Sequence, residues 1–352
     1  MRLEFVKNLK GNEVLARNII NEIGEILIKA GMKINSDLIS RLKKYGVFMV
    51  YVEDERLSDI SNGQDLTELK KTTLEIMPNL FNELFEGDKL TSKKSIGMLD
   101  ELIDDIISQK NININLYEVK AYDNYTYIHC VDTSIMAVYL GTCLKLNQLE
   151  IKELGLSAIL HDIGKIKVPN RIINKTGPLN NAEFREIKKH TIYGKEILER
   201  AGIFPTKVME GVLQHHERVD GTGYPYGLMK NQISDYAKII AVSDVFTAIS
   251  ANRSYRKKFD PKEAYKLIVG GIDNKFDSTV VDKFKKNFAI YPLGCCVRLS
   301  NGIEGYVVKQ NKSFPEKPVI RVVYDNISKE PIQFYEINLV EKLTIFIESV
   351  VE

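Results

Sequence analysis

The sequence predicts a mainly α-helical protein, in which a helical bundle follows a small α/β domain and precedes a small β-rich module. Apolar residues return at helical spacing from about residue 115 to residue 288. All five histidines of the 352-residue chain lie in this helical stretch, where ligands on separate helices can converge. After residue 291 the pattern changes to short apolar runs separated by Gly, Asn, Pro and Asp, which is typical of strands and turns.

The composition is that of an ordinary folded protein. Hydrophobic residues make up 44% and charged residues 27%, which fits a globular chain of two or three domains. The formal net charge of +2 does not favour a DNA- or RNA-binding protein, which usually shows a clustered basic excess. We therefore expect no nucleic-acid partner.

The sequence favours a cytoplasmic protein. No apolar run reaches the ~18 residues of a membrane span, and the first residues lack the apolar core of a secretory signal. The four cysteines form no C-x-x-C pair and no evident disulfide framework. Cys130 and Cys143 lie in apolar helical surroundings and are expected to be small buried hydrophobes.

The first region, residues 1–110, is expected to form a mixed α/β N-terminal domain. Its role in regulation or dimerisation is a hypothesis without support from any single residue. Apolar spacing and Pro and Gly breaks define its elements. In order, these are helices at 21–31 and 36–45, a buried strand at 47–52, and helices over 66–108 interrupted at Pro78 and Gly87.

The second region, residues 111–290, is expected to hold the helical bundle and the functional site. Apolar residues such as Ile128, Val131 and Ile135 recur about once per helical turn. The expected helices are 125–146, 154–163, 182–201, 207–216, 237–251 and 261–270.

The third region, residues 291–352, is expected to be a small β-rich module that caps the bundle or binds a partner. Its apolar runs are short and end at turn-forming residues. The expected strands are 295–299, 305–309, 318–324 and 332–335.

The histidines and two aspartates of the helical region indicate a metal site. Imidazole and carboxylate ligands together suit divalent ions such as Zn, Fe, Mn and Ni. Because the ligands are far apart in sequence, four or five helices must each point one inward, which is how bundles build metal sites. The candidate ligands are His129, His161, Asp162, His190, His215, His216 and Asp244.

Each of these positions also has a structural interpretation. His129 and His190 lie among apolar residues and, taken alone, are typical of buried core histidines. A carboxylate in the apolar run around Asp244 is costly to bury unless it is paired or bound to a metal. His161 and Asp162 follow the apolar sequence GLSAIL, which places two polar groups at the inner end of a buried helix. The structural interpretation is acceptable for each position but not for all of them together.

Several stretches of the helical region carry motifs in a fixed order. They are YTYIHCVDTS (125–134), HDIGKIKVPNRIINKTGPL (161–179), the helix around His190, HHERVDGTGYP (215–225) and AVSDVFTAISANRSYRK (241–257). Together they resemble the HD-GYP phosphodiesterases, a branch of the HD hydrolase superfamily with an all-helical HD-type bundle. The resemblance covers about half of the chain and is specific, because the motifs share both order and spacing.

The resemblance implies that all the candidate ligands hold two divalent metal ions, iron or manganese rather than zinc, with Asp162 bridging them. Some family members hold a third metal with a Glu where this chain has Tyr125, which cannot easily replace a carboxylate. We therefore expect a two-metal site that shares a hydroxide and stabilises the attacking and leaving oxygens of a phosphodiester.

The resemblance also implies contacts to the substrate. Asp162 and Lys165 are the expected catalytic residues, and the matching family lysine contacts a phosphate. Lys165 lies four residues after His161 and faces the same side if the helical turn continues. The loop tyrosine could stack on a guanine. The structural alternatives are a simple turn for the loop and a solvated basic face for residues 253–258. The implied binding residues are Lys165, Gly223, Tyr224, Pro225, Arg253 and Arg256.

The expected function is hydrolysis of cyclic di-GMP to pGpG by attack of a metal-bridging hydroxide, and the sequence leaves open whether pGpG is cut further to GMP. The alternatives are another cyclic dinucleotide such as cyclic GMP-AMP, or a non-catalytic sensor or scaffold. An HD nucleotidase with a simpler ligand set would not explain His190 or the pair His215–His216. A homodimer, and a GGDEF-type or other signalling partner at the GYP loop, are further hypotheses. The family often has a second Asp where this chain has Thr247, which we interpret as tuning of the site.

Overall fold

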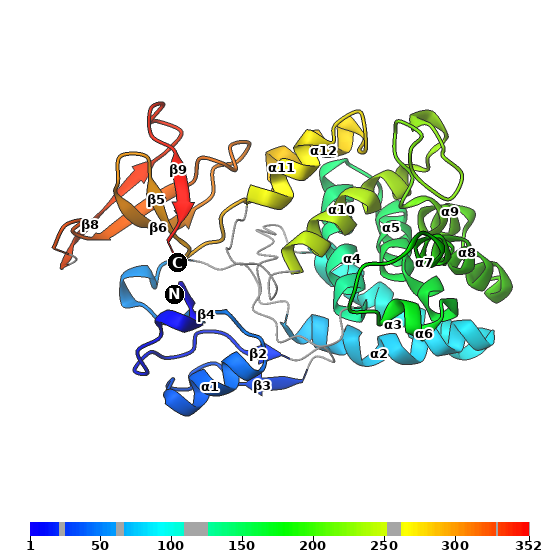
Figure 1. Cartoon of the computed structure of the whole chain (residues 1–352), viewed down its shortest axis with the longest axis horizontal. Coiled ribbons are helices and arrows are strands. Elements are labelled where there is room, and N and C mark those ends of the chain that lie inside the picture. The colour runs from blue at the N-terminus through cyan, green and yellow to red at the C-terminus, as the bar shows by residue number, and fades with distance from the viewer. Residues whose placement is uncertain (21–24, 61–66, 109–125, 252–261, 329, 352) are drawn as a thin grey trace.

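Most helices gather on one side of the molecule, and the strands lie on the other side together with helix α1 (Ser36–Lys44) and both ends of the chain (Figure 1). This computed structural model describes the chain except for residues 21–24, 61–66, 109–125, 252–261, 329 and 352. The predicted fold class, mainly α with a small β module, is confirmed. Among the helices described, none combines the length and the apolar character that a membrane crossing requires.

The N-terminal segment forms two small antiparallel sheets and a helix. β1 (Arg2–Phe5) pairs with β4 (Met49–Val52), and β2 (Ile19–Ile20) pairs with β3 (Ile26–Ile28). Helix α1 (Ser36–Lys44) begins after Asn35, whose side chain accepts a hydrogen bond from the backbone N–H of Leu38. This cap satisfies a donor that the first helical turn leaves free.

Two expectations for this region are wrong. The described part of residues 21–31 contains strand β3 instead of a helix, because a short apolar run does not by itself distinguish the two. The break expected at Pro78 is absent, since α2 (Thr67–Glu86) runs through it. Leu74, Met77 and Leu80 of α2 are buried in the core, so tertiary packing outweighs the local cost of the proline.

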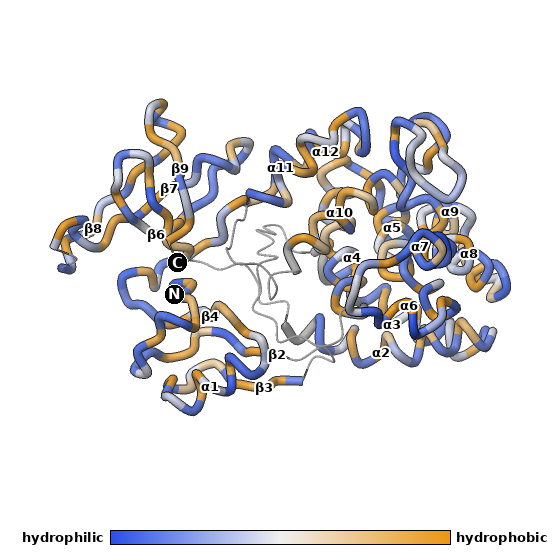
Figure 2. Tube along the Cα trace, viewed as in Figure 1, coloured by the Kyte–Doolittle hydropathy of each residue, from blue (hydrophilic) through white to orange (hydrophobic). Residues whose placement is uncertain are grey.

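The helical body is organised around α4 (Thr126–Cys143), which packs on α5 (Gln148–Leu160) and α10 (Asp235–Ala251). Figure 2 shows α10 as largely hydrophobic, whereas the surface helix α7 (Asn181–Lys188) is largely hydrophilic. The other elements are α3 (Lys89–Ser108), η3 (Ile163–Lys167), α6 (Asn170–Ile173), α8 (His190–Ala201), α9 (Thr206–Gln214), η4 (Lys230–Gln232), α11 (Lys262–Gly270) and α12 (Ser278–Asn287).

The expected helices of this region are confirmed, with different bounds. α5 begins six residues earlier than expected because Asn147 and Glu150 form a capping box there. The helix expected over 182–201 is two helices, α7 and α8, which meet at Lys189. Helices α6 and α12 were not foreseen.

One hydrophobic core extends through the helical body. It includes Leu74 of α2, Leu99 of α3, Ile135 of α4 and Phe284 of α12. Helices α2 and α3 therefore pack with the bundle although they precede residue 110. The ranges 1–110, 111–290 and 291–352 stay predictions as domain boundaries.

The C-terminal segment is one five-stranded antiparallel sheet in the order β8-β7-β6-β5-β9. The last strand, β9, was not foreseen, and the expected strands are confirmed with small shifts. The strands are β5 (Cys296–Leu299), β6 (Glu304–Lys309), β7 (Val319–Tyr324), β8 (Pro331–Asn338) and β9 (Ile347–Val350).

The N-terminal strands and the C-terminal sheet share a second core. Leu3 and Tyr51 pack in the same cluster as Val297 and Ile320. Arg321 reinforces this contact, since its guanidinium donates to both carboxylate oxygens of Asp59 at 2.6 and 2.7 Å. The two ends of the sequence therefore form one packed unit beside the helical body, which carries the candidate site.

Candidate metal centre

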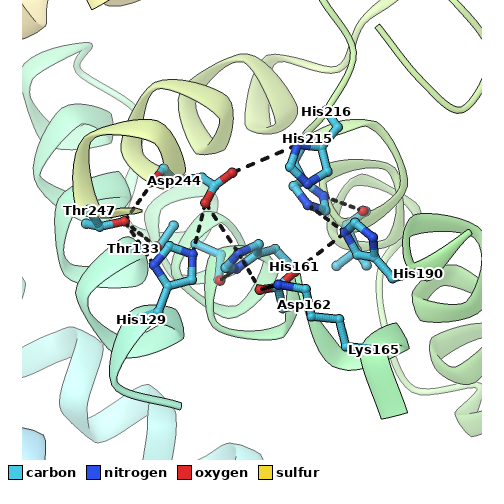
Figure 3. A network of polar contacts seen from close by, with 12 residues as sticks. His129, Thr133, His161, Asp162, Lys165, His190, His215, His216, Asp244 and Thr247 are labelled. Carbon is cyan, nitrogen blue, oxygen red and sulfur yellow. Dashed lines mark hydrogen bonds and ion pairs between the residues drawn. The ribbon is translucent and has the colours of Figure 1, made fainter. Parts of the chain in front are cut away.

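The histidines and aspartates singled out in the sequence meet at the centre of the helical body, and Figure 3 shows them pointing toward one another. Most are buried, and the His216 side chain is 29% exposed. Five places in the fold supply them: His129 on α4, His161 and Asp162 after α5, His190 at the start of α8, His215 and His216 after α9, and Asp244 on α10.

A close backbone contact brings two of these places together. Asp162 lies where α5 gives way to the 3-10 helix η3, and η3 packs on α8. At Gly164 a Cβ atom would overlap the carbonyl oxygen of His190 and the backbone nitrogen of Gly194. Only glycine therefore allows η3 to approach α8 closely enough for Asp162 to reach His190.

The side chains form two groups. Within each group, the possible ligand atoms all lie within 4.8 Å of one another. One group is His190, His215 and His216, and the other is His129, His161 and Asp162. These groups could each hold a metal ion, and two carboxylates connect them.

Asp162 and Asp244 both span the two groups. Asp162 Oδ1 lies 3.5 Å from His190 Nε2, and its Oδ2 lies 3.4 Å from His161 Nε2. Asp244 Oδ1 lies 2.9 Å from His129 Nε2, and its Oδ2 lies 3.9 Å from His216 Nδ1. An arrangement of two imidazole groups joined by carboxylates suits a pair of divalent ions.

Three of the histidines are fixed in one tautomer by the backbone. The Nδ1 atoms of His161, His190 and His215 each lie 2.7 Å from a carbonyl oxygen three residues earlier. A carbonyl only accepts hydrogen bonds, so each Nδ1 carries the proton and each Nε2 presents a lone pair. Backbone carbonyls commonly orient metal-binding histidines in this way.

These lone pairs face one another and need a cation. The Nε2 atoms of His190 and His215 are 3.3 Å apart, and two acceptors cannot hydrogen-bond to each other. The buried His161 Nε2 has no hydrogen-bond partner among the described residues. Two metal ions, one held by His190 and His215 and the other by His161, would satisfy all three nitrogens, so the residues fit such ions.

The Nδ1 atom of His129 faces a threonine hydroxyl rather than a backbone carbonyl. The Thr247 hydroxyl lies 3.3 Å from His129 Nδ1 and 2.9 Å from the Thr133 hydroxyl. Thr247 also donates to the carbonyl oxygen of Ser243 at 2.9 Å. The position where the family often has a second Asp thus places a neutral hydroxyl beside the imidazole.

Burial sets the protonation state of the site. It lowers the pKa of His161 and His190, and lowers that of His216 to about 3. Burial opposes the charge of Asp162, but Lys165 and the neighbouring histidines outweigh it and hold the Asp162 pKa well below its usual range. Burial also opposes the charge of Asp244, but the hydrogen bond with His129 and the nearby histidines together outweigh it and hold the Asp244 pKa below its usual range. Neutral imidazoles with ionised carboxylates are the state that binds metal ions.

Lys165 lies beside the carboxylate that joins the two groups. Its Nζ is 2.6 Å from Asp162 Oδ2, and about a third of its side chain is exposed. The helical turn assumed from the sequence does not continue past Leu160, and η3 brings Lys165 to the site instead. Burial opposes its charge, but Asp162 outweighs burial and raises the Lys165 pKa, so the ammonium stays positive.

The loop with Gly223, Tyr224 and Pro225 folds back onto the metal centre. The Tyr224 ring lies 4.7 Å from the His216 ring, and its backbone N–H donates to the His216 carbonyl. A Cβ at Gly223 would overlap the backbone of Glu217. The peptide bond between Tyr224 and Pro225 is cis.

Sequence reasoning missed the residue that holds this loop. Glu217 is 3% exposed and accepts hydrogen bonds from the backbone N–H groups of Tyr226 at 2.7 Å and Leu228 at 3.0 Å. Its position directly after His215–His216 was the only available signal. Arg253 and Arg256, predicted to bind the ligand, lie outside the described residues, as does Tyr125.

Comparison with known proteins places this site in a family. A family model described as HD domain matches residues 101–280. The chain belongs to the HD domain family. HD domains bind divalent metals, in keeping with the two ligand groups. A second model, described as a KOW domain associated with HD domain, matches residues 296–352, so the C-terminal sheet is one that accompanies HD domains elsewhere.

Several curated relatives share the HD region. Cyclic di-GMP phosphodiesterase PA4108 of Pseudomonas aeruginosa is 35% identical over 254 residues, which cover 72% of this chain and 61% of that protein. Cyclic di-GMP phosphodiesterase PdeB of Borreliella burgdorferi is 32% identical, over 58% of this chain and 53% of that protein. 3'3'-cGAMP-specific phosphodiesterase 3 of Vibrio cholerae is 33% identical, over 49% and 38%. The chain thus spans less than two thirds of the length of each.

Proposed function

We propose that this HD protein is a metal-dependent phosphodiesterase that hydrolyses cyclic di-GMP to pGpG. The observation that carries the proposal is the pair of ligand groups joined by Asp162 and Asp244. Two adjacent divalent ions are a recurrent solution for in-line displacement at phosphorus. The similarity to phosphodiesterases that act on cyclic di-GMP supports this substrate.

We propose that the site holds two metal ions, which are either iron or manganese. When bound, such a pair supplies a nucleophile of lowered pKa and positive charge for the phosphoryl oxygens. His190, His215 and His216 would hold one ion, and His129 and His161 the other. Asp162 would bridge both, and Asp244 would complete the set.

The protein's own residues position the substrate and stabilise charge. The Lys165 ammonium, kept positive by Asp162, would face the scissile phosphate and stabilise the negative charge that develops there. Tyr224 lies on His216, so it would contact a guanine next to the reacting phosphate. Gly223 and Pro225 shape this loop, and Arg253 and Arg256 are predicted to bind phosphates and bases.

A second candidate substrate is cyclic GMP-AMP. It is favoured by the similarity to a Vibrio cholerae phosphodiesterase specific for that molecule. A cytoplasmic location, a homodimer and a signalling partner at the GYP loop stay predictions.

Turnover of a panel of cyclic dinucleotides, with the metal content measured on the same reduced sample, tests the proposal. We expect roughly two ions per chain and preferred hydrolysis of cyclic di-GMP. His161→Ala and Asp162→Ala should lose both metal and turnover, whereas Asp235→Ala, which removes an 84% exposed carboxylate on α10, should lose neither. A reduced native protein with no metal and no turnover would favour the non-catalytic scaffold.

A further inference from the structure

Lys188 is a cation beside the metal centre to which the proposed function gives no role. It is the last residue of α7, two positions before His190. Its Nζ lies 5.6 Å from the centroid of the Tyr224 ring and 5.2 Å from that of Phe184. The Tyr224 ring in turn lies on His216. The Tyr224 ring therefore contacts both Lys188 and a candidate metal ligand.

Lys188 differs from its lysine neighbours in having no carboxylate partner in the part of the chain that the structure describes. Lys165 pairs with Asp162, and Lys189 pairs with Glu186 at 2.6 Å. Lys167 likewise pairs with a glutamate on α8. The two aromatic rings support the Lys188 side chain but leave its charge uncompensated, because a cation–π contact is weaker than a contact with an anion.

The proposed substrate carries a second anionic group besides the phosphodiester that is cut. A cyclic dinucleotide carries two phosphodiester groups, and the metal pair with Lys165 engages the one that is cut. The second phosphodiester also carries a negative charge, for which Arg253 and Arg256 are predicted partners and Lys188 is a further cation within the described residues. A lysine with three donors on a flexible stem suits such a charge.

We infer that Lys188 binds the second, uncut phosphodiester of the substrate, an inference that rests on the proposed function. In this arrangement Tyr224 lies between the two phosphate positions, with His216 and the metal centre near one and Lys188 near the other. Lys188 would then make the site selective for a diester with a second phosphate.

Lys188→Met tests this inference, because methionine keeps the packing on the rings and removes the charge. We expect KM for cyclic di-GMP to rise about 10- to 100-fold, the factor that one hydrogen bond to a charged group is worth, with kcat nearly unchanged. Bis(p-nitrophenyl) phosphate has a single phosphodiester, so its kcat/KM should not change. Lys188→Arg should restore most of the affinity.

Lys189→Met is the matched control, since it removes the same charge one residue away, from a side chain that is 51% exposed and paired with Glu186. Lys189→Met should change neither KM for cyclic di-GMP nor kcat/KM for bis(p-nitrophenyl) phosphate. An unchanged KM for cyclic di-GMP in Lys188→Met would overturn the inference. An equal loss of kcat/KM with both substrates would overturn it as well.

Equilibrium binding separates this inference from the proposed function. If the metal-loaded native protein binds cyclic di-GMP without cutting it, the proposed activity fails, and a tenfold weaker Kd for Lys188→Met still supports the role of Lys188. Equal Kd values for the variant and the native protein would refute that role. Absence of binding to the native protein would refute both.

Discussion

Replacing Glu217 with Gln is expected to loosen the loop that carries Tyr224 while leaving the metal ligands in place. The two Glu217 carboxylate oxygens accept one backbone N–H each, from Tyr226 at 2.7 Å and Leu228 at 3.0 Å. Gln has the same shape but only one acceptor oxygen, so its NH2 group would face a backbone N–H donor.

The expected cost follows from this geometry. A hydrogen bond to a charged group contributes about 1.5–3 kcal/mol, and Glu217 is 3% exposed, so little solvent screening reduces that value. Loss of one such bond should accelerate hydrogen exchange of the loop amides about 10- to 100-fold. Because the loosened loop would displace Tyr224, KM for cyclic di-GMP should rise by a larger factor than kcat falls.

Hydrogen exchange at the Tyr226 and Leu228 amides measures the first effect, with Glu210→Gln on α9 as a control that should change nothing. A double-mutant cycle with Tyr224→Ala measures the second, because Glu217→Gln should add no further rise in KM once the ring is gone. Unchanged exchange at both amides would refute the reasoning. A rise in KM that persists in the Tyr224→Ala background would show that Glu217 acts by another route.

Three further changes test other features. Gly164→Ala should lower the free energy of unfolding by about 3 kcal/mol or more in urea denaturation and reduce metal content, since the new methyl overlaps the backbone of His190. The metal-free protein should lose thermal stability as the pH falls below about 6.5. The reason is that His216 takes up a proton in the unfolded chain but not in the folded protein, where its pKa is about 3. Equal melting temperatures at pH 7 and pH 5 would contradict this expectation. Arg321→Met should lower the free energy of unfolding by about 2–3 kcal/mol, and Asp59→Asn in that background should cost little more.

The sequence predicts most of the helices and singles out the histidines and aspartates that the structure brings together, because both stand out in the local pattern. A histidine such as His129 in an apolar helix, or a carboxylate such as Asp244, is conspicuous against its neighbours. Strand β3 and the continuity of α2 through Pro78 depend on tertiary packing, which a local pattern does not contain. Glu217 binds N–H groups nine and eleven residues further on, a contact set by the path of the loop.

The packing of the first strands against the last sheet has a consequence for synthesis on the ribosome. Leu3 and Tyr51 are translated about 250 to 320 residues before their partners Val297 and Ile320, an interval of tens of seconds. During that interval the helical body can assemble around its own core, while the apolar face of β1 and β4 stays uncovered. Chaperone dependence during translation should therefore concentrate on the first sixty residues and end when the final strands emerge.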